Sequence, residues 1–363
     1  LKKKYGKNLF KLILFMTIFY MFIFLCAEVT AIALLINYIS ATPLWITSLT
    51  VLSTTLIYTL YGGLRVSIFT DIIQTIIILV LFLILLNYII SFQENSFSIE
   101  IIRNNRPQLI SNKYIPNYTS GITFFIAVAA TNLFHQGNWQ RVYAAKNVEV
   151  LKKSLLMSFV VIIPIIFFMG FSGLVAVSIN PNINPDLAFF SLLLRDQTEL
   201  LSIFIIVLGL TLTISTVDTL INAISSSVII DFKAVFSFVN KKNYLKISKY
   251  FIIFISSIAF VISSKGFSIL YLFLLADLFC CAAVISVFYG FFSKKINEKN
   301  INLSIIIGLI LGFLLFPSPN FSKSILVGVL FPEEFFPNLI SNYLLFWSFL
   351  VATLAPIFVW KVR

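Results

Sequence analysis

The stretch ELLSIFIIVLGLTLTISTVDTLINAISSSVII, residues 199–230, decides the fold of this chain. Glu199 and Asp218 are its only charged residues, and most of its other side chains are apolar. A helix needs about 20 predominantly apolar residues to cross a hydrocarbon core about 30 Å thick. This stretch is long enough, so we predict a membrane-spanning helix over residues 199–230.

The composition extends this prediction to the rest of the chain. Of its 363 residues, 60% are hydrophobic, 40 are Phe and only 11% are charged, whereas a soluble domain carries about 25% charged residues. These values exclude a soluble enzyme and predict an all-α integral membrane protein. The chain contains about ten apolar stretches long enough to span a membrane: 9–39, 44–62, 67–91, 121–145, 150–179, 199–230, 247–264, 266–293, 301–316 and 341–361.

The cations predict the orientation of these spans. The chain has a net charge of +12, but its cations are spread between spans and do not form one basic domain, so we expect no nucleic-acid partner. Twenty of the 26 Lys and Arg fall in alternate segments, namely 1–11, 63–66, 141–153, 231–249, 294–300 and 361–363. Cytoplasmic loops are enriched in Lys and Arg. We therefore predict a multi-pass protein of the cell membrane with the lipid bilayer around it and both termini cytoplasmic.

The organisation along the chain is uniform. No Pro/Gly/Ser-rich linker or charge run divides it, so residues 1–363 are expected to form a single membrane domain. The chain begins with Leu1, and its first residues, LKKKYGKN, have the character of a cytoplasmic loop, so we expect the protein to have a further N-terminal part. The three cysteines lie within apolar segments, which predicts neither a disulfide framework nor a zinc site.

A polar stripe runs through the span at 199–230. Its members recur every three or four residues and so share one helical face: Thr211, Ser215, Asp218 or Thr219, Asn222 and Ser226. Such a face is expected to meet protein or water rather than lipid, and its oxygens suit a small hard cation such as Na⁺. Alternatively, each hydroxyl bonds only to the carbonyl four residues before it.

The span at 121–145 holds the second candidate site. His135, Gln136, Gly137 and Asn138 lie near its midpoint, and three of these four residues are poor helix formers. This pattern predicts a helix break at bilayer depth, where transporters bind substrate and ions. The alternative is a continuous helix in which His135 is an ordinary core residue.

Three further acids lie within spans. Glu28 and Asp277 are expected either to pair with a buried donor or to act in a site. Asp71 follows YGGLRVSIFT near the cytoplasmic side, where it either caps a tight turn or lines a path by which a cation leaves. No nucleotide-binding Gly loop, metal cluster or Ser–His–Asp set is present in the sequence.

Four segments resemble the sodium:solute symporter family, in the order found there: TLYGGLRVSIFTDIIQ (59–74), NWQRVYAAKN (138–147), ISTVDTLINAISS (214–226) and FSILYLFLLADLFCCAA (267–283). The resemblance implies a LeuT-type core of two inverted five-helix repeats. Residues 1–91 would be the remainder of the first repeat, without its first two core helices. Residues 121–293 would be the second repeat, and residues 301–363 additional C-terminal helices.

The resemblance also implies roles for individual residues. The family's main sodium site would use Ser215, Thr216 and the carbonyl of Leu212, together with the absent first core helix. Asp71 matches an acid on the family's sodium exit route. Residues 135–138 match its broken helix, which carries substrate and gate contacts, and Gly137 stands where sugar carriers have a gating aromatic residue, which argues against a sugar.

These observations predict a secondary active transporter that couples Na⁺ to a small polar solute by alternating access, with no obligate protein partner. One alternative is a membrane sensor, because some family members carry a signalling kinase. The other is an intramembrane enzyme using His135 and an acid, which we do not expect because His135 has no obvious catalytic partner.

Overall fold

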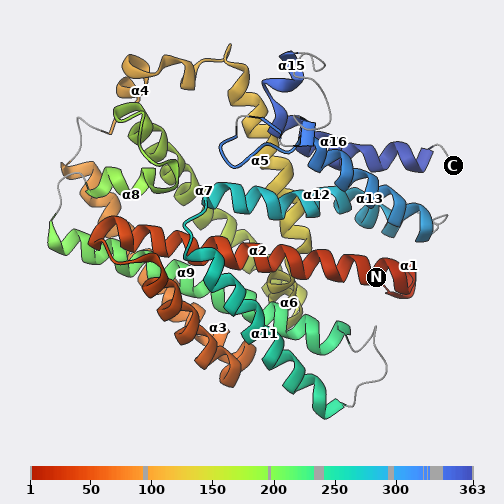
Figure 1. Ribbon diagram of the computed structural model, residues 1–363. Coiled ribbons are helices and arrows are strands. Elements are labelled where there is room, and N and C mark those ends of the chain that lie inside the picture. The colour runs from red at the N-terminus through yellow and green to blue at the C-terminus, as the bar shows by residue number, and fades with distance from the viewer. Residues whose placement is uncertain are drawn as a thin grey trace.

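The computed structural model describes residues 2–92, 97–194, 198–232, 241–292, 298–321, 323–324, 326–327 and 338–361. These residues are almost entirely helical (Figure 1). The main helices are α2 (Lys7–Ser40), α3 (Leu44–Phe92), α5 (Ile115–Phe134), α6 (Gln136–Ala144), α7 (Val148–Ile179), α9 (Glu199–Ser227), α11 (Lys241–Ser263), α12 (Ile269–Phe292), α13 (Glu298–Leu315) and α16 (Leu344–Lys361). Shorter elements are α1 (Lys2–Tyr5), α4 (Ile99–Asn105), η1 (Pro107–Ile110), η2 (Pro185–Leu187), α8 (Ala188–Leu193), the π-helical η4 (Val228–Phe232) and α15 (Asn338–Ser341).

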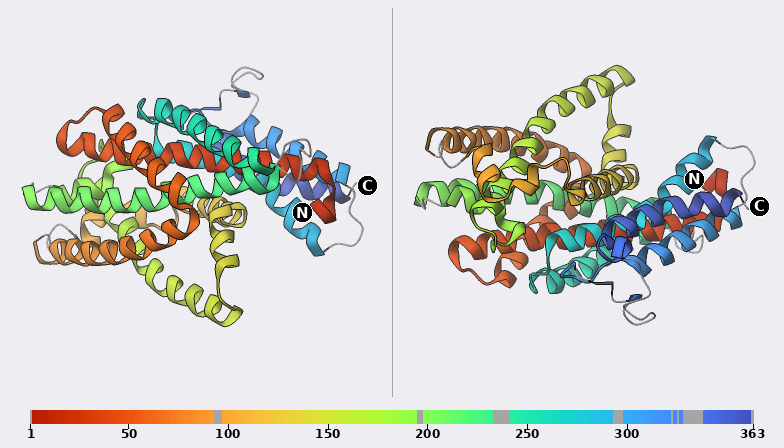
Figure 2. Two further views of the ribbon diagram at one scale, coloured as in Figure 1. Left: turned by 90° about the horizontal axis from the view of Figure 1, so that it is seen from below. Right: turned by 90° about the horizontal axis from the view of Figure 1, so that it is seen from above.

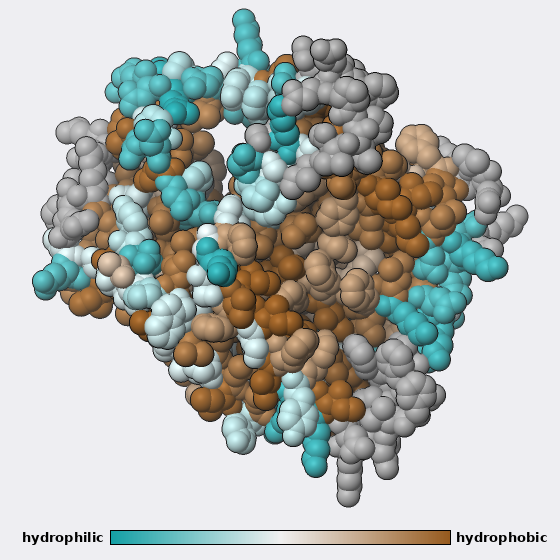
Figure 3. Space-filling view, viewed as in Figure 1, coloured by the Kyte–Doolittle hydropathy of each residue, from teal (hydrophilic) through white to brown (hydrophobic). Residues whose placement is uncertain are grey.

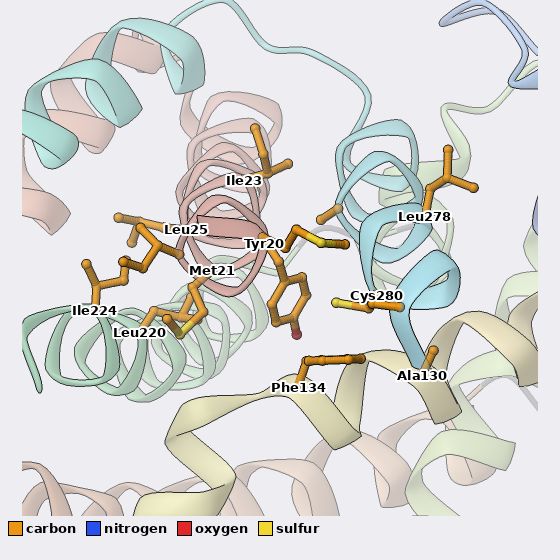
Figure 4. Packing of buried hydrophobic residues seen from close by; sticks show 14 of the residues in the cluster. Tyr20, Met21, Ile23, Leu25, Ala130, Phe134, Leu220, Ile224, Leu278 and Cys280 are labelled. Carbon is orange, nitrogen blue, oxygen red and sulfur yellow. The ribbon is translucent and has the colours of Figure 1, made fainter. Parts of the chain in front are cut away.

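Helix α2 runs through the middle of the bundle and contacts α3, α9, α11 and α12 (Figure 1). Its side chains are apolar on nearly every face, which is the pattern of a helix surrounded by protein. Figure 4 shows Met21 and Leu25 packed against Leu220 and Ile224 of α9, while Tyr20 reaches toward α5 and α12. The core therefore brings together residues about 200 positions apart in the sequence, such as Met21 of α2 and Leu220 of α9.

Two helices are interrupted. In α3 the interruption is Gly63, whose positive φ of 56° is accessible to glycine at little steric cost. Between α5 and α6 it is His135, whose φ of −70° and ψ of 101° are extended. The predicted helix break at residues 135–138 is thus confirmed, and the continuous helix is wrong.

Seven of the described helices are long and apolar enough to cross a membrane. They include α3, which contains both of the predicted spans 44–62 and 67–91 on either side of Gly63. The predicted span 121–145 is divided between α5 and α6, and the tenth span corresponds to a shorter apolar helix in α16, Leu344–Val359. The prediction of an all-α membrane protein is confirmed.

The outer surface fits a bilayer. Figure 3 shows one face that is mostly hydrophobic across its middle, with hydrophilic residues gathered toward its edges. Helix α7 leans away from the rest of the bundle in both views of Figure 2, and its buried residues all lie in its last eight positions, 172–179. Helix α1 and the end of α16 lie at the same end of the bundle.

Candidate functional site

A cavity of about 540 Å³ lies at the break between α5 and α6. Five helices line it: α2, α5, α6, α9 and α12. Of the residues singled out from the sequence, seven border it: Glu28, His135, Asn138, Ser215, Thr216, Thr219 and Asp277. The cavity therefore brings together the two predicted polar regions, the stripe on α9 and the broken span.

The break holds polar side chains in fixed positions. The Nδ1 atom of His135 accepts a hydrogen bond from the backbone N–H of Asn138 at 3.3 Å, which caps the start of α6. The Asn138 amide donates to Asn132 Oδ1 at 3.1 Å, across the break. The imidazole of His135 packs edge-on against the rings of Tyr20 and Phe24, with centroids 6.0 and 6.1 Å away.

The predicted sodium ligands on α9 have different partners in the structure. The Ser215 hydroxyl donates to Asp71 Oδ1 at 2.9 Å. The Thr216 hydroxyl donates to the Leu212 carbonyl at 3.2 Å, so two predicted ligands bond to each other. The alternative for this stripe, local bonding to the preceding turn, applies to Thr211, which donates to Val207 O at 2.6 Å, and to Thr219, which lies 2.8 Å from Ser215 O. Thr216, beside the stripe, bonds in the same way.

Asp71 forms an ion pair that joins three helices. Its Oδ2 atom lies 2.5 Å from Arg141 Nη2 on α6, and its Oδ1 atom accepts from Ser215 on α9. The same Nη2 atom of Arg141 donates to Thr219 Oγ1 at 2.7 Å. Asp71 is thus not a turn cap, because it lies inside α3 and its carboxylate contacts α6 and α9.

Asp218 is fully buried next to this pair. Its carboxylate accepts hydrogen bonds from Tyr58, Ser67 and Thr70 of α3 at 3.1, 3.1 and 3.2 Å. Thr219 Oγ1 lies 3.2 Å from Asp218 Oδ1. Hydroxyl groups therefore surround this carboxylate, and Thr219 links it to Arg141. We call the set of Asp71, Arg141, Asp218, Thr219 and their hydroxyl partners the inner network.

Glu28 and Asp277 have different surroundings. In the part of the chain that the structure describes, neither carboxylate forms an ion pair, although Asp277 is only 8% exposed. Thr131 lies beside Asp277, but its hydroxyl donates to the Ala127 carbonyl at 2.6 Å. Neither acid therefore has a cationic partner among the described residues, and both border the cavity.

The remaining predicted residues lie at the edges of the site. Gln136 borders a neighbouring, largely apolar cavity of about 460 Å³. Gly137 is buried against α9, where a Cβ atom would lie 2.5 Å from Thr219 Cγ2. Asn222 borders a third cavity of about 250 Å³ next to Gly63, and its Nδ2 atom has no hydrogen-bond partner among the described residues.

Sequence reasoning missed several residues of this site. Arg141 was counted only as a cytoplasmic cation, although it lies inside the quoted segment NWQRVYAAKN. The sequence feature that could have identified Arg141 is its position one helical turn after Gly137, near the break. The hydroxyl groups around Asp218 carry no such signal, because their recognition requires knowing how α3 crosses α9.

A bundle of membrane-spanning helices, with a broken helix beside a cavity that charged side chains border, defines a multi-pass membrane protein with an internal cavity. The model of the sodium:solute symporter family matches residues 1–308. The chain belongs to the sodium:solute symporter family, and the resemblance found in the four sequence segments is confirmed. The family consists of transporters, so the intramembrane enzyme is excluded.

Two known proteins are similar to the chain. One is a solved structure described as the substrate-bound outward-open state of a Na⁺-coupled sialic acid symporter, with a TM-score of 0.72 and 17% identity, over 99% of this chain and 75% of that chain. This likeness confirms the LeuT-type fold. The other is the spermidine transporter DUR31 of Candida albicans, 28% identical over 276 residues. That match covers 74% of this chain and 50% of the relative, so the chain spans about half the length of this curated relative.

Proposed function

We propose that the protein is a secondary active transporter that couples the entry of Na⁺ to the uptake of a small polar solute. One observation carries the proposal: two adjacent hydroxyl residues, Ser215 and Thr216, border the central cavity, and the carboxylate of Asp71 lies 2.9 Å from Ser215 Oγ. Hydroxyl, carbonyl and carboxylate oxygens are ligands for a small hard cation. Membership of the family and the fold of a Na⁺-coupled neighbour support the same function.

In this proposal Na⁺ binds Ser215, Thr216 and the carbonyl of Leu212. Rotation of the Thr216 hydroxyl away from Leu212 O would free both oxygens, which now bond to each other at 3.2 Å. Asp71 lies on the path by which Na⁺ leaves. Arg141 pairs with Asp71 and so holds a positive charge where the ion would pass, which limits how long Na⁺ stays at that carboxylate.

The break at His135 supplies the moving part. Residues 135–138 would contact solute and form the inner gate, because α6 can change its angle to α5 without breaking a continuous helical ladder. We assign residues 1–91 to the first repeat, 121–293 to the second and 301–363 to additional helices. The 20 of 26 cations in alternate segments support a cell-membrane protein with both ends of this chain cytoplasmic.

The energy available from Na⁺ suits nutrient uptake. One charge crossing 100 mV gains about 2.3 kcal/mol, and a tenfold Na⁺ gradient adds about 1.4 kcal/mol. Together these would support an accumulation of about 500-fold per ion. The curated relative's name adds a polyamine as one candidate solute.

Uptake by the intact protein in sealed vesicles tests the proposal. We expect accumulation of a radiolabelled solute only with an inward Na⁺ gradient, and a raised Na⁺ concentration for half-maximal uptake in the double variant Ser215→Ala, Thr216→Ala. The loss of two ligand oxygens should raise that concentration by about tenfold or more. Ser257→Ala is the matched control, because this exposed serine bonds only to the preceding turn of α11. Uptake driven equally well by a proton gradient without Na⁺ would refute the choice of ion.

A further inference from the structure

The cavity wall formed by α2 and α12 carries two acidic side chains without cationic partners. Glu28 lies on α2 and Asp277 on α12, and both border the cavity of about 540 Å³. The cavity also contains Arg141, but Asp71 already pairs with this guanidinium at 2.5 Å. Within the described residues, the charge of the α2–α12 wall is therefore not balanced by the protein.

Such carboxylates are costly in a membrane. A single Asp at the centre of a spanning helix costs about 2.5–3.5 kcal/mol on insertion scales. Two of them facing one cavity are compensated either by protonation or by a cation that enters the cavity. Helix α9 shows how the protein balances an acid that belongs to its own framework, since Asp218 accepts three hydroxyl hydrogen bonds from α3.

Aromatic rings stand beside the two acids. Phe24, one turn before Glu28 on α2, lies 4.6 Å from Phe273, one turn before Asp277 on α12, measured between ring centroids. Tyr20 lies one turn before Phe24, and all three rings border the cavity. Figure 4 shows Tyr20 pointing from α2 toward Phe134 and Cys280. Ring faces attract ammonium groups, and the attraction grows when water is excluded.

We propose that the solute is an organic cation carrying two ammonium groups, bound by Glu28 and Asp277 with its hydrocarbon chain against Tyr20, Phe24 and Phe273. This inference rests on the proposed transport function and adds the substrate class. Acids on two different helices favour a linear diamine or polyamine over a monoamine. The size of the cavity and its aromatic wall favour an organic ligand over a bare metal ion, and no group of three or more His, Cys, Asp or Glu suited to a metal occurs in the described part of the chain.

Equilibrium binding to the purified intact protein tests the inference. Radiolabelled putrescine and spermidine are the probes, measured at saturating Na⁺. We expect Glu28→Gln and Asp277→Asn each to weaken binding by about 10–100-fold, because each removes one charge-assisted hydrogen bond. Glu149→Gln should bind as the unchanged protein does, because this acid is exposed and paired with Lys153 on α7.

Competition experiments keep the test decisive where a variant fails to fold. With the unchanged protein, putrescine should displace the probe at least tenfold better than butylamine, and 1,4-butanediol, which has the same chain length and no charge, should not displace it. Displacement by butanediol as readily as by putrescine would overturn the inference, as would unchanged binding in both variants.

The two proposals fail in different ways. If urea or proline drives Na⁺-dependent uptake and the amines neither bind nor compete, the transport function stands and the cationic solute is wrong. If the amines bind in the expected order but their uptake ignores the Na⁺ gradient, the inference stands and the coupling is wrong.

Discussion

Four carboxylates of the membrane-spanning helices lie in or beside one cavity, and they form two pairs that differ in their partners. Asp71 and Asp218, in the inner network, accept hydrogen bonds from Arg141, Ser215 and a set of hydroxyl groups on α3. Glu28 and Asp277, on the α2–α12 wall, form no ion pair within the described residues. The difference separates carboxylates that hold helices together from carboxylates that remain open to a ligand.

This difference has a physical reason. In a low-dielectric interior, a carboxylate that is part of the framework must be compensated by fixed donors, because its charge is present in every state of the protein. A carboxylate that binds a cationic ligand must leave its lone pairs free until the ligand arrives. Substitutions in the inner network should therefore lower the stability of the folded protein, whereas substitutions in the α2–α12 wall should weaken binding of the solute.

The largest effect is expected for Arg141→Gln. The change leaves Asp71 with one fixed donor, Ser215, in a site where the two charged side chains are 33% and 21% exposed. Breaking a fully buried pair costs about 3–5 kcal/mol, and the partial exposure here reduces our expectation to about 2–4 kcal/mol. Thermal unfolding of the purified intact protein, followed by tryptophan fluorescence, measures the loss.

Two further variants separate the pair from its surroundings. Arg65→Gln alters an exposed arginine of α3 and should change stability by less than about 0.5 kcal/mol. The double variant Asp71→Asn, Arg141→Gln should recover most of the loss, because no unpaired charge remains. An Arg141→Gln protein that unfolds at the unchanged temperature would show that this pair does not hold α3 and α6 together.

A smaller effect is expected for Gly137→Ala, at the junction of the two regions. The new Cβ atom would lie 2.5 Å from Thr219 Cγ2 and 2.9 Å from His135 Cε1. Helix α6 would have to move away from α9, at a cost of about 1–3 kcal/mol. We expect a lower unfolding temperature and slower Na⁺-driven uptake.

The double variant Gly137→Ala, Thr219→Ser should restore much of both properties, because serine keeps the hydroxyl that Arg141 contacts and removes the methyl group in the way. Gly170→Ala is the control, since a Cβ atom there meets no other atom within 4 Å. A double variant as impaired as the single one would place the constraint elsewhere.

The fold was largely predictable from the sequence, because hydropathy and charge act locally along a helix. The break at His135 was also predictable, since polar and flexible residues at bilayer depth conflict with a continuous apolar span. The predicted spans 44–62 and 67–91 likewise correspond to the two parts of α3 on either side of the interruption at Gly63.

The side-chain partners could not be predicted in the same way. Arg141 reaches Asp71 across 70 positions, and Ser67 reaches Asp218 across 151. These pairs depend on how three helices cross, which is a property of packing rather than of local pattern. The stripe on α9 indicated correctly that its face meets protein. Local bonding of a hydroxyl to the preceding turn, as Thr216 shows, was one of the alternatives that the sequence left open. The sequence gave no sign that Ser215 would bond to Asp71.

The smallest change in stability is expected for Glu28→Gln and Asp277→Asn, and this expectation separates the two regions most sharply. Each variant replaces a carboxylate that no described cation compensates, so the folded state should gain or lose less than about 1 kcal/mol in the absence of solute. Asp218→Asn is the comparison, because it disturbs a carboxylate that accepts three hydroxyl hydrogen bonds from α3 and should cost about 1–3 kcal/mol.

Thermal unfolding without ligand, repeated with putrescine, measures both the stability of each variant and its binding of the diamine. The unchanged protein should be stabilised by putrescine, whereas Glu28→Gln and Asp277→Asn should not be. If Glu28→Gln instead lost as much stability as Asp218→Asn, Glu28 would be part of the framework, and the two pairs of acids would serve the same purpose.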